Sequence, residues 1–320
     1  MERNKRITRR AGIAASIALV AAILLFVVYN RIDLLMNPPD TALPENNSIL
    51  LNIDNQYKIP VATFHFSYEN TVSKIHACFD TGCAINTISD RTYRLIKGQG
   101  YVKKEYFCPL LLTDSNKSTK LQTRCVHIDI PVQLIPDLGL EHCIKNVRFF
   151  VIPSDEMMTL GVEFLKEFVI HSEYGGRQWL LDHKTPQKYM ASYQLKSFNW
   201  HMNDLGGRYY WPLAVGDTEE DFFIDTAYGI APLQMPIEEY KGSNPTQIDS
   251  LYSSYSVVPV KKTYDTLAVK AGDITFNTPI CFIDGQRNTY YVVNPQALST
   301  VFNISYDLKN KKLYVLKQLE

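Results

Sequence analysis

The hydrophobic pattern begins with a run from Ala11 to Tyr29 that contains no charged residue and follows five basic residues within the first ten. Nineteen apolar or small residues are enough to cross the hydrocarbon core of a bilayer. Basic residues before the run favour a cytoplasmic N-terminus. The pattern therefore predicts a cytoplasmic tail over residues 1–10 and an uncleaved signal anchor over 11–30. A cleaved signal peptide is the alternative, but its apolar core is usually ~7–15 residues long and ends at a small-residue cleavage site, which is not evident here.

The rest of the chain has mainly the pattern of strands. Residues 31–48 are rich in Pro and Asn and predict a linker. After them, short apolar runs alternate with polar turns. The order of patterns then repeats: strand, Asp-Thr-small turn, strand, short helix and further strands. We therefore expect an all-β fold with few short helices, in which a first lobe (49–182) and a second lobe (206–320) flank a connection over 183–205.

Two short turns carry the most informative chemistry. Asp80-Thr81-Gly82 and Asp225-Thr226-Ala227 each lie between two apolar segments, at equivalent places in the repeat. An ordinary β-turn is one interpretation, because Asp and Gly are common in turns. Ordinary turns, however, have polar neighbours, and an ionised carboxylate among apolar strands is costly. The other interpretation is a pair of carboxyl groups that shares one proton, so that one member acts as a base and the other as an acid.

Composition and cysteine spacing argue against nucleic-acid binding, a zinc site and a cysteine nucleophile. Lys plus Arg and Asp plus Glu both number 33, so the formal net charge of zero provides no electrostatic footprint for nucleic acid. The spacing of the six cysteines fits no zinc pattern, and we expect neither a metal nor a cofactor. Cys83 lies near Asp80, but no His is evidently directed at it. A small buried hydrophobic side chain is a better interpretation of Cys83 than a nucleophile.

Cys108 and Cys125 are placed symmetrically about the polar tip, residues 114–118, of a predicted hairpin. A simple hairpin register sets them opposite each other, at a distance that a disulfide accepts. A non-cytoplasmic compartment would favour such a bridge. The alternative is two buried thiols, because a register slip of one residue would direct the side chains to opposite faces.

The first Asp turn resembles the catalytic motif of the retropepsin and pepsin-like aspartic proteases, here of a two-lobed, membrane-anchored bacterial type. The match is Phe79 to Cys83. Leu160-Gly161, followed by Phe164-Leu165, resembles the segment that packs under the active-site loop in that family. Asp225-Thr226-Ala227 resembles a second, divergent copy in which Ala replaces the family's Gly. Asn294 or Pro295 stands where a second Leu-Gly is expected.

The resemblance implies two retropepsin-like β-barrel lobes related by a pseudo-two-fold axis. It implies that Asp80 and Asp225 are catalytic and hold a water between them, while Thr81, Gly82, Thr226 and Ala227 support the two loops. The expected activity is endopeptidase action on a peptide or protein substrate, by a single-pass protein of the cell membrane whose bulk is periplasmic or extracellular. The alternative is a non-catalytic, membrane-tethered protein that binds an extended peptide by strand addition. The sequence does not indicate an oligomeric state.

Overall fold

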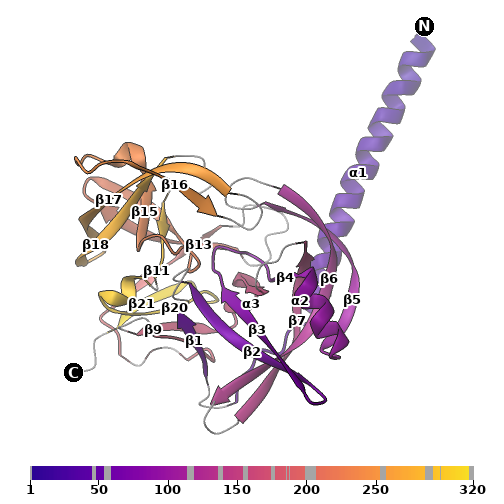
Figure 1. Cartoon of the computed structure of the whole chain (residues 1–320). Coiled ribbons are helices and arrows are strands. Elements are labelled where there is room, and N and C mark those ends of the chain that lie inside the picture. The colour runs from indigo at the N-terminus through magenta and orange to yellow at the C-terminus, as the bar shows by residue number, and fades with distance from the viewer. Residues whose placement is uncertain are drawn as a thin grey trace.

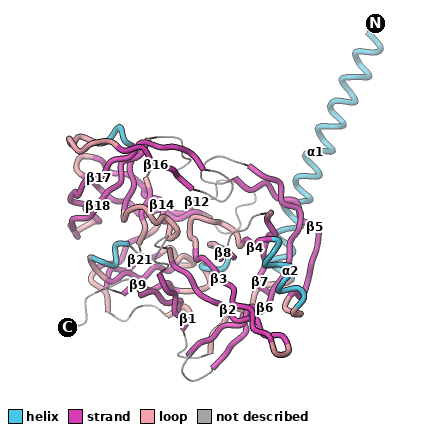
Figure 2. Tube along the Cα trace, viewed as in Figure 1, coloured by secondary structure: helices cyan, strands magenta, loops and turns pink. Residues whose placement is uncertain are grey.

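Strands make up most of the protein (Figure 2), so the prediction of an all-β fold is confirmed. The pairings arrange them as one sheet of 13 strands and one of 8, and they do not show the lobes as barrels. The structure is a computed structural model of the chain. It describes residues 2–44, 48–53, 59–113, 119–135, 140–153, 158–173, 177–184, 186, 188–198, 207–252, 257–284, 291–295 and 297–316.

The chain begins with a long helix, α1 (Glu2–Met36), which projects away from the body (Figure 1). Large apolar side chains such as Ile17, Leu24 and Leu25 are exposed on it. The helix continues past residue 30, where the anchor was expected to end, to Met36. Within the residues that the structure describes, no helix has an apolar stretch long enough to cross a membrane.

Among its described residues, the first lobe contains ten strands and two short helices. They are β1 (Ser48–Ile53), β2 (Pro60–Tyr68), β3 (Thr71–Phe79), β4 (Thr87–Ser89), α2 (Asp90–Gly98), β5 (Val102–Thr113), β6 (Thr119–Ile135), β7 (Leu140–Ile152), β8 (Met158–Leu160), α3 (Val162–Leu165), β9 (Val169–Glu173) and β10 (Arg177–Leu181). The predicted helix after the first Asp turn is α2. It begins where the Ser89 hydroxyl accepts a hydrogen bond from the backbone N–H of Thr92 at 3.1 Å, and it buries Tyr93 and Ile96 on one face.

The second lobe repeats this order. After β11 (Ala191–Gln194) and β12 (Lys196–Phe198), its elements are β13 (Arg208–Val215), β14 (Thr218–Ile224), β15 (Leu233–Pro236), η2 (Ile237–Glu239), β16 (Gln247–Tyr252), β17 (Val257–Ala271), β18 (Ile274–Ile283), β19 (Val292–Val293), η3 (Ala297–Thr300), β20 (Asn303–Asp307) and β21 (Lys312–Leu316). Strands β3 and β4 pair in parallel with β8 and β7, and strands β14 and β15 pair in parallel with β19 and β18. The same pattern of parallel pairing thus occurs in both parts of the chain.

The connection between the lobes holds two strands that the sequence did not predict, β11 and β12. Strand β11 pairs with β21 and strand β12 pairs with β13, just as β1 pairs with both β10 and β2 in the first lobe. Both strands are short, and their residues are exposed or only half-buried. Their pairing partners, rather than an apolar pattern of their own, therefore define them.

The lobes are joined through strands β9 and β20, which pair antiparallel from Val169↔Asp307 to Ser172↔Ile304. Six strands thus run side by side in the order β11-β21-β20-β9-β10-β1, and Figure 1 shows the C-terminal strands lying next to β9. One buried apolar cluster includes residues of both lobes, among them Phe79, Phe164, Trp211 and Phe222. This shared core fixes the ends of β3 and β14 relative to each other.

Candidate active site

The two Asp turns occupy equivalent positions, each directly after a strand. Asp80 follows β3, and its backbone N–H donates to the carbonyl of Leu160 on β8 at 3.0 Å. Asp225 follows β14, and its backbone N–H donates to the carbonyl of Val293 on β19, also at 3.0 Å. Each carboxyl group is therefore supported by an equivalent pair of parallel strands in its own lobe, β3 and β8 for Asp80 and β14 and β19 for Asp225.

Thr81 and Thr226 hold the two turns together across the lobes. The backbone N–H of Thr81 donates to the Thr226 hydroxyl at 3.0 Å, and the backbone N–H of Thr226 donates to the Thr81 hydroxyl at 3.0 Å. Each hydroxyl then donates to a strand carbonyl of the other lobe: Thr81 to Ile224 at 2.9 Å and Thr226 to Phe79 at 2.7 Å. Both threonines are only 1% exposed, so these four bonds are shielded from water.

Gly82 and Ala227 occupy matching positions in the two turns. The backbone N–H of Gly82 donates to Asp80 Oδ1 at 2.7 Å, and the backbone N–H of Ala227 donates to Asp225 Oδ1 at 3.0 Å. A hydrogen bond of this kind favours the ionised carboxylate. The Ala at position 227 therefore preserves the backbone bond that Gly makes in the first lobe.

The electrostatics of the pair favour a single shared proton. Burial, and then the negative charge of Asp225, raise the pKa of Asp80 to about 8, against the opposing effect of the N–H groups of Gly82 and Cys83. A side-chain hydrogen bond between Asp80 and Asp225 acts in the same direction. Two carboxyl groups in such contact titrate as a unit, and the unit retains one proton at neutral pH. Both residues are partly exposed, so solvent reaches them.

A second layer of contacts supports the Asp80 turn from below. The Asn86 side chain accepts a hydrogen bond from the Gly161 N–H at 2.9 Å, and the Val162 N–H donates to the carbonyl of Cys83 at 2.8 Å. A Cβ on Gly161 would lie 2.3 Å from the carbonyl oxygen of Ile85. Only Gly fits beneath this turn, because a backbone oxygen at that distance has little freedom to move.

Asn294 takes the place of that glycine in the second lobe. Its backbone N–H donates to the carbonyl of Pro232 at 2.8 Å, and its side-chain Nδ2 donates to the carbonyl of Tyr228 at 2.7 Å. Tyr228 is the third residue after Asp225, as Cys83 is the third after Asp80. The Asn side chain thus satisfies the carbonyl that a backbone N–H satisfies in the first lobe, and the departure from Leu-Gly leaves this turn supported.

The sequence did not predict the buried ion pair between Arg148 and Glu163. Arg148 Nε and Nη2 donate to the two carboxylate oxygens of Glu163 at 3.0 and 3.1 Å, and the residues are 2% and 4% exposed. The carbonyl of Arg148 also accepts from the Asn86 side chain at 2.9 Å. The available signal was Glu163 itself, because a charge within an apolar segment requires a partner when it is buried.

The predicted Cys108–Cys125 disulfide is wrong, since all six cysteines are thiols. Near the tip Leu110 lies opposite Gln122, one residue away from the simple hairpin register. A bulge between Phe107 and Leu110 then shifts the register by one more residue, so that Tyr106 lies opposite Cys125. Both cysteines are fully buried in one small apolar cluster, as the alternative of two buried thiols requires.

Cys83 is a poor nucleophile in this setting. Burial and the charge of Asp80 raise the pKa of its thiol to about 12, and the thiol donates to the carbonyl of Ile85 at 3.1 Å. Because the thiolate is the reactive form, this thiol is inert at neutral pH. Within the described parts of the chain, no group of three or more His, Cys, Asp or Glu residues could hold a metal ion.

A surface cavity of about 690 Å³ lies apart from the two aspartates. It is lined by the start of α2, by β6 around Leu121 to Arg124 and by the end of β7. Three arginines, Arg91, Arg94 and Arg124, contribute to its wall, and neither Asp80 nor Asp225 does.

No family model matches the chain, and no curated protein matches it in sequence. Solved structures do share its fold. Basic 7S globulin from soybean is similar, with a TM-score of 0.51 and 9% identity over 84% of this chain and 94% of that one. Conglutin gamma, a basic 7S globulin from lupine seeds, gives the same four values. A protein described as edgp matches over the same shares, with a TM-score of 0.50 and 9% identity. At this identity the likeness concerns the fold alone.

Proposed function

We propose that the chain is an aspartic endopeptidase that hydrolyses peptide bonds with a water activated between Asp80 and Asp225. One observation carries the proposal: the crossed hydrogen bonds of Thr81 and Thr226 hold two equivalent Asp turns so close that a Cβ on Gly82 would lie 2.9 Å from both carboxylate oxygens of Asp225. Burial and the charge of Asp225 raise the pKa of Asp80 to about 8. When the two protons of a carboxyl pair are lost at well-separated pKa values, one group can act as an acid while the other acts as a base.

In this mechanism the Asp80–Asp225 pair starts with one proton. The ionised carboxylate accepts a proton from the water as the water oxygen bonds to the peptide carbonyl carbon, and the protonated carboxyl group donates its proton to the carbonyl oxygen. In the second step the leaving nitrogen receives a proton from the pair, and the C–N bond breaks with its electrons going to nitrogen. One hydroxyl of the diol gives its proton to the other carboxylate as the carbonyl re-forms, which restores the pair with one proton. The hydrogen bonds between Thr81 and Thr226, together with those from the N–H groups of Gly82 and Ala227, fix the positions of both carboxyl groups. Such a reaction requires this positioning.

We further propose that each lobe is retropepsin-like and that the lobes are related by a pseudo-two-fold axis, with the substrate peptide bound across both Asp turns. The matching pairings of β3, β4, β7 and β8 with β14, β15, β18 and β19 support this arrangement.

The membrane anchor and the non-cytoplasmic position of the body are also proposals. They rest on the uncharged run from Ala11 to Tyr29 and the basic residues before it. N-terminal sequencing of the mature protein tests them. An intact start near residue 1 supports an anchor, and a start near residue 30 would indicate a removed signal peptide.

A non-catalytic protein that binds an extended peptide is the second candidate. The comparisons favour it, because the similar structures from soybean and lupine are described as globulins and not as peptidases. Ala227 in place of Gly is the feature of this chain that agrees with it.

Digestion of a peptide library by the full-length protein in detergent, between pH 4 and 9, separates the two candidates. Asp80→Asn is the matched control. Cleavage by the native protein and not by the variant supports the peptidase. Equal retention of intact peptides by both proteins, without cleavage by either, supports the binding protein.

A further inference from the structure

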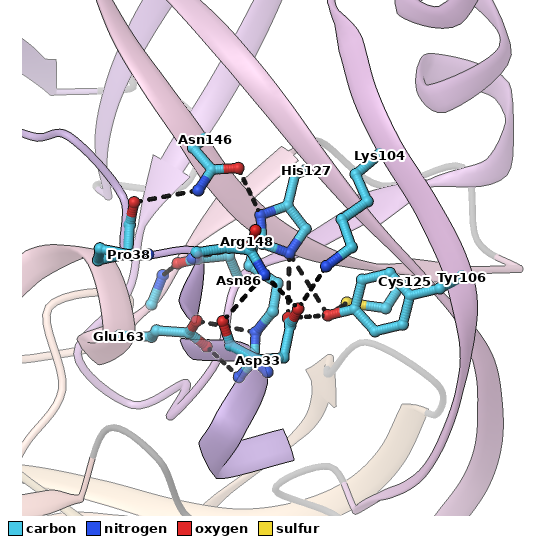
Figure 3. A network of polar contacts seen from close by, with 12 residues as sticks. Asp33, Pro38, Asn86, Lys104, Tyr106, Cys125, His127, Asn146, Arg148 and Glu163 are labelled. Carbon is cyan, nitrogen blue, oxygen red and sulfur yellow. Dashed lines mark hydrogen bonds and ion pairs between the residues drawn. The ribbon is translucent and has the colours of Figure 1, made fainter. Parts of the chain in front are cut away.

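Asp33, near the end of α1, is buried in the first lobe although it comes from outside both lobes. It is 5% exposed, and it contacts side chains on two neighbouring strands (Figure 3). Its Oδ1 accepts from Lys104 Nζ on β5 at 2.7 Å. Its Oδ2 accepts from the Tyr106 hydroxyl on β5 and lies 3.1 Å from His127 Nε2 on β6. One carboxylate therefore joins the end of α1 to the hairpin β5–β6.

Asp33 is charged in this position. Burial raises its pKa, but the hydrogen bonds from Lys104 and Tyr106 and the charge of His127 offset that effect, so that the pKa is lowered overall. His127, which is fully buried, has an acceptor at each ring nitrogen: Asp33 at Nε2 and the Asn146 side chain at Nδ1, 2.8 Å away. Removing the Asp33 charge would leave buried donors without their acceptor, which is costly.

The residues that follow Asp33 are attached to the same lobe. Asn146 Nδ2 donates to the carbonyl of Pro38 at 3.0 Å. The backbones of Asp40 and Lys145 exchange two hydrogen bonds, at 2.9 and 3.0 Å. Leu43 is 5% exposed and belongs to the apolar core. The predicted linker, residues 31–48, is thus packed against the first lobe at Pro38, Asp40 and Leu43.

The contacts of Asp33 continue toward the support of the Asp80 turn. The Cys125 thiol donates to the Tyr106 hydroxyl at 3.2 Å, and the charge of Arg148 acts on both Cys125 and Tyr106. Arg148 pairs with Glu163, the second residue of α3, directly beneath the turn. Figure 3 shows this group and the Asp33 group side by side. The Asp33 group and the Arg148–Glu163 pair are thus joined through the paired strands β6 and β7, on which His127 lies opposite Arg148.

We propose that Asp33 is a positioning residue, through which the segment after α1 holds hairpin β5–β6 and the support of the Asp80 turn in their working geometry. Its effect on catalytic rate rests on the proposed peptidase function, whereas its effect on the order of the first lobe does not. Asp33 touches no reacting atom and acts through Lys104, Tyr106 and His127, each of which contacts its carboxylate.

Hydrogen exchange on the full-length protein in detergent tests this proposal independently of activity. The variant is Asp33→Asn, and Asp40→Asn, an exposed acid in the same segment, is the matched control. We expect Asp33→Asn to accelerate exchange in β5, β6 and α3 on the order of 100-fold, because a buried charge cluster loses its central acceptor. Strands β17 and β18 of the second lobe should stay unchanged, as should all strands in Asp40→Asn. Unchanged exchange in β5, β6 or α3 of Asp33→Asn would overturn the proposal.

Lys104→Met keeps the test decisive if Asp33→Asn does not fold. Where Asp33→Asn folds, the double variant Asp33→Asn/Lys104→Met shows whether the two residues act together. Lys104 is partly exposed, so its loss is milder, and exchange should rise in the same three elements. If the residues act together, the double variant is no worse than Asp33→Asn alone. Strictly additive effects would overturn the proposal.

Kinetics on a cleaved peptide add the functional readout. We expect Asp33→Asn to lower kcat by at least about tenfold while KM changes less, because positioning affects the reacting groups more than peptide binding. A change in KM alone would overturn the rate effect. If the native protein cleaves no peptide while exchange behaves as expected, the proposed function fails and the positioning role of Asp33 stands.

Discussion

Gly82 faces the carboxyl group of Asp225 so closely that a Cβ at position 82 would lie 2.8 Å from Asp225 Cγ and 2.9 Å from both carboxylate oxygens. The third residue of one turn thus forms part of the wall around the carboxyl group of the other. Glycine at this position is required for the two carboxyl groups to meet.

Gly82→Ala should therefore displace Asp225 and separate the pair. We expect peptide cleavage to fall by at least about 100-fold, because acid–base catalysis by positioned groups contributes at least that much. Ala227→Gly is the matched control, since it makes the second turn identical in type to the first. It should retain activity, and equal activity of the native protein and Gly82→Ala would mean that the close contact with Asp225 has no functional role.

Thr226→Val should destabilise the protein. The variant leaves the buried N–H of Thr81 without its acceptor and the carbonyl of Phe79 without its donor. Each such buried group costs about 1–3 kcal/mol. We expect the free energy of unfolding, measured by urea denaturation, to fall by roughly 2–5 kcal/mol. Thr275→Val, an exposed threonine on β18, should change it by less than about 0.5 kcal/mol.

Asp80→Asn should change how stability depends on pH. The pKa of Asp80 is raised in the folded protein from 3.8 to about 8, so the folded state retains a proton that the unfolded state loses. This contribution is fully present below about pH 4 and is lost as the pH rises toward 8, by up to roughly 1.4 kcal/mol per unit. Asn mimics the protonated form, so the variant should gain stability relative to the native protein over this range. Parallel stability curves for the two proteins would contradict the raised pKa.

Arg148→Met should destabilise the folded protein far more on its own than in combination with Glu163→Leu. The single change leaves Glu163 buried and unpaired, at a cost of about 3–5 kcal/mol, whereas an apolar pair of similar size is nearly neutral. Thermal unfolding of the single and double variants measures the difference. Equal destabilisation would show that the ion pair is not what joins β7 to α3.

The sequence predicted the features that depend on local pattern. Residues that are neighbours in the sequence determine each of them: the two Asp-Thr-small turns, the helix capped by Ser89 and the hairpin around residues 114–118. The strands of that hairpin are β5 and β6, while its tip lies outside the described residues. Periodicity was therefore a sound basis for the fold and for the positions of the two aspartates.

The features that the sequence did not predict depend on distant partners. Asp33 looked like a linker residue because its contacts, Lys104 and His127, lie 71 and 94 positions away. Cys108 looked like a disulfide partner because a bulge is not visible in the spacing. Asn294 was read as a departure from the Leu-Gly motif, because only the folded turn shows that its side chain donates a hydrogen bond to the carbonyl of Tyr228.

The pH profile of kcat/KM for the full-length protein, Asp80→Asn and Asp225→Asn on one cleaved peptide tests the central claim most directly. A pair that shares one proton predicts activity at neutral pH that falls as the pH rises through about 8, and a loss of at least about 100-fold in each variant at every pH. A variant that cleaves the peptide at the native rate, or a native profile that stays level above pH 8, would contradict catalysis by Asp80 and Asp225.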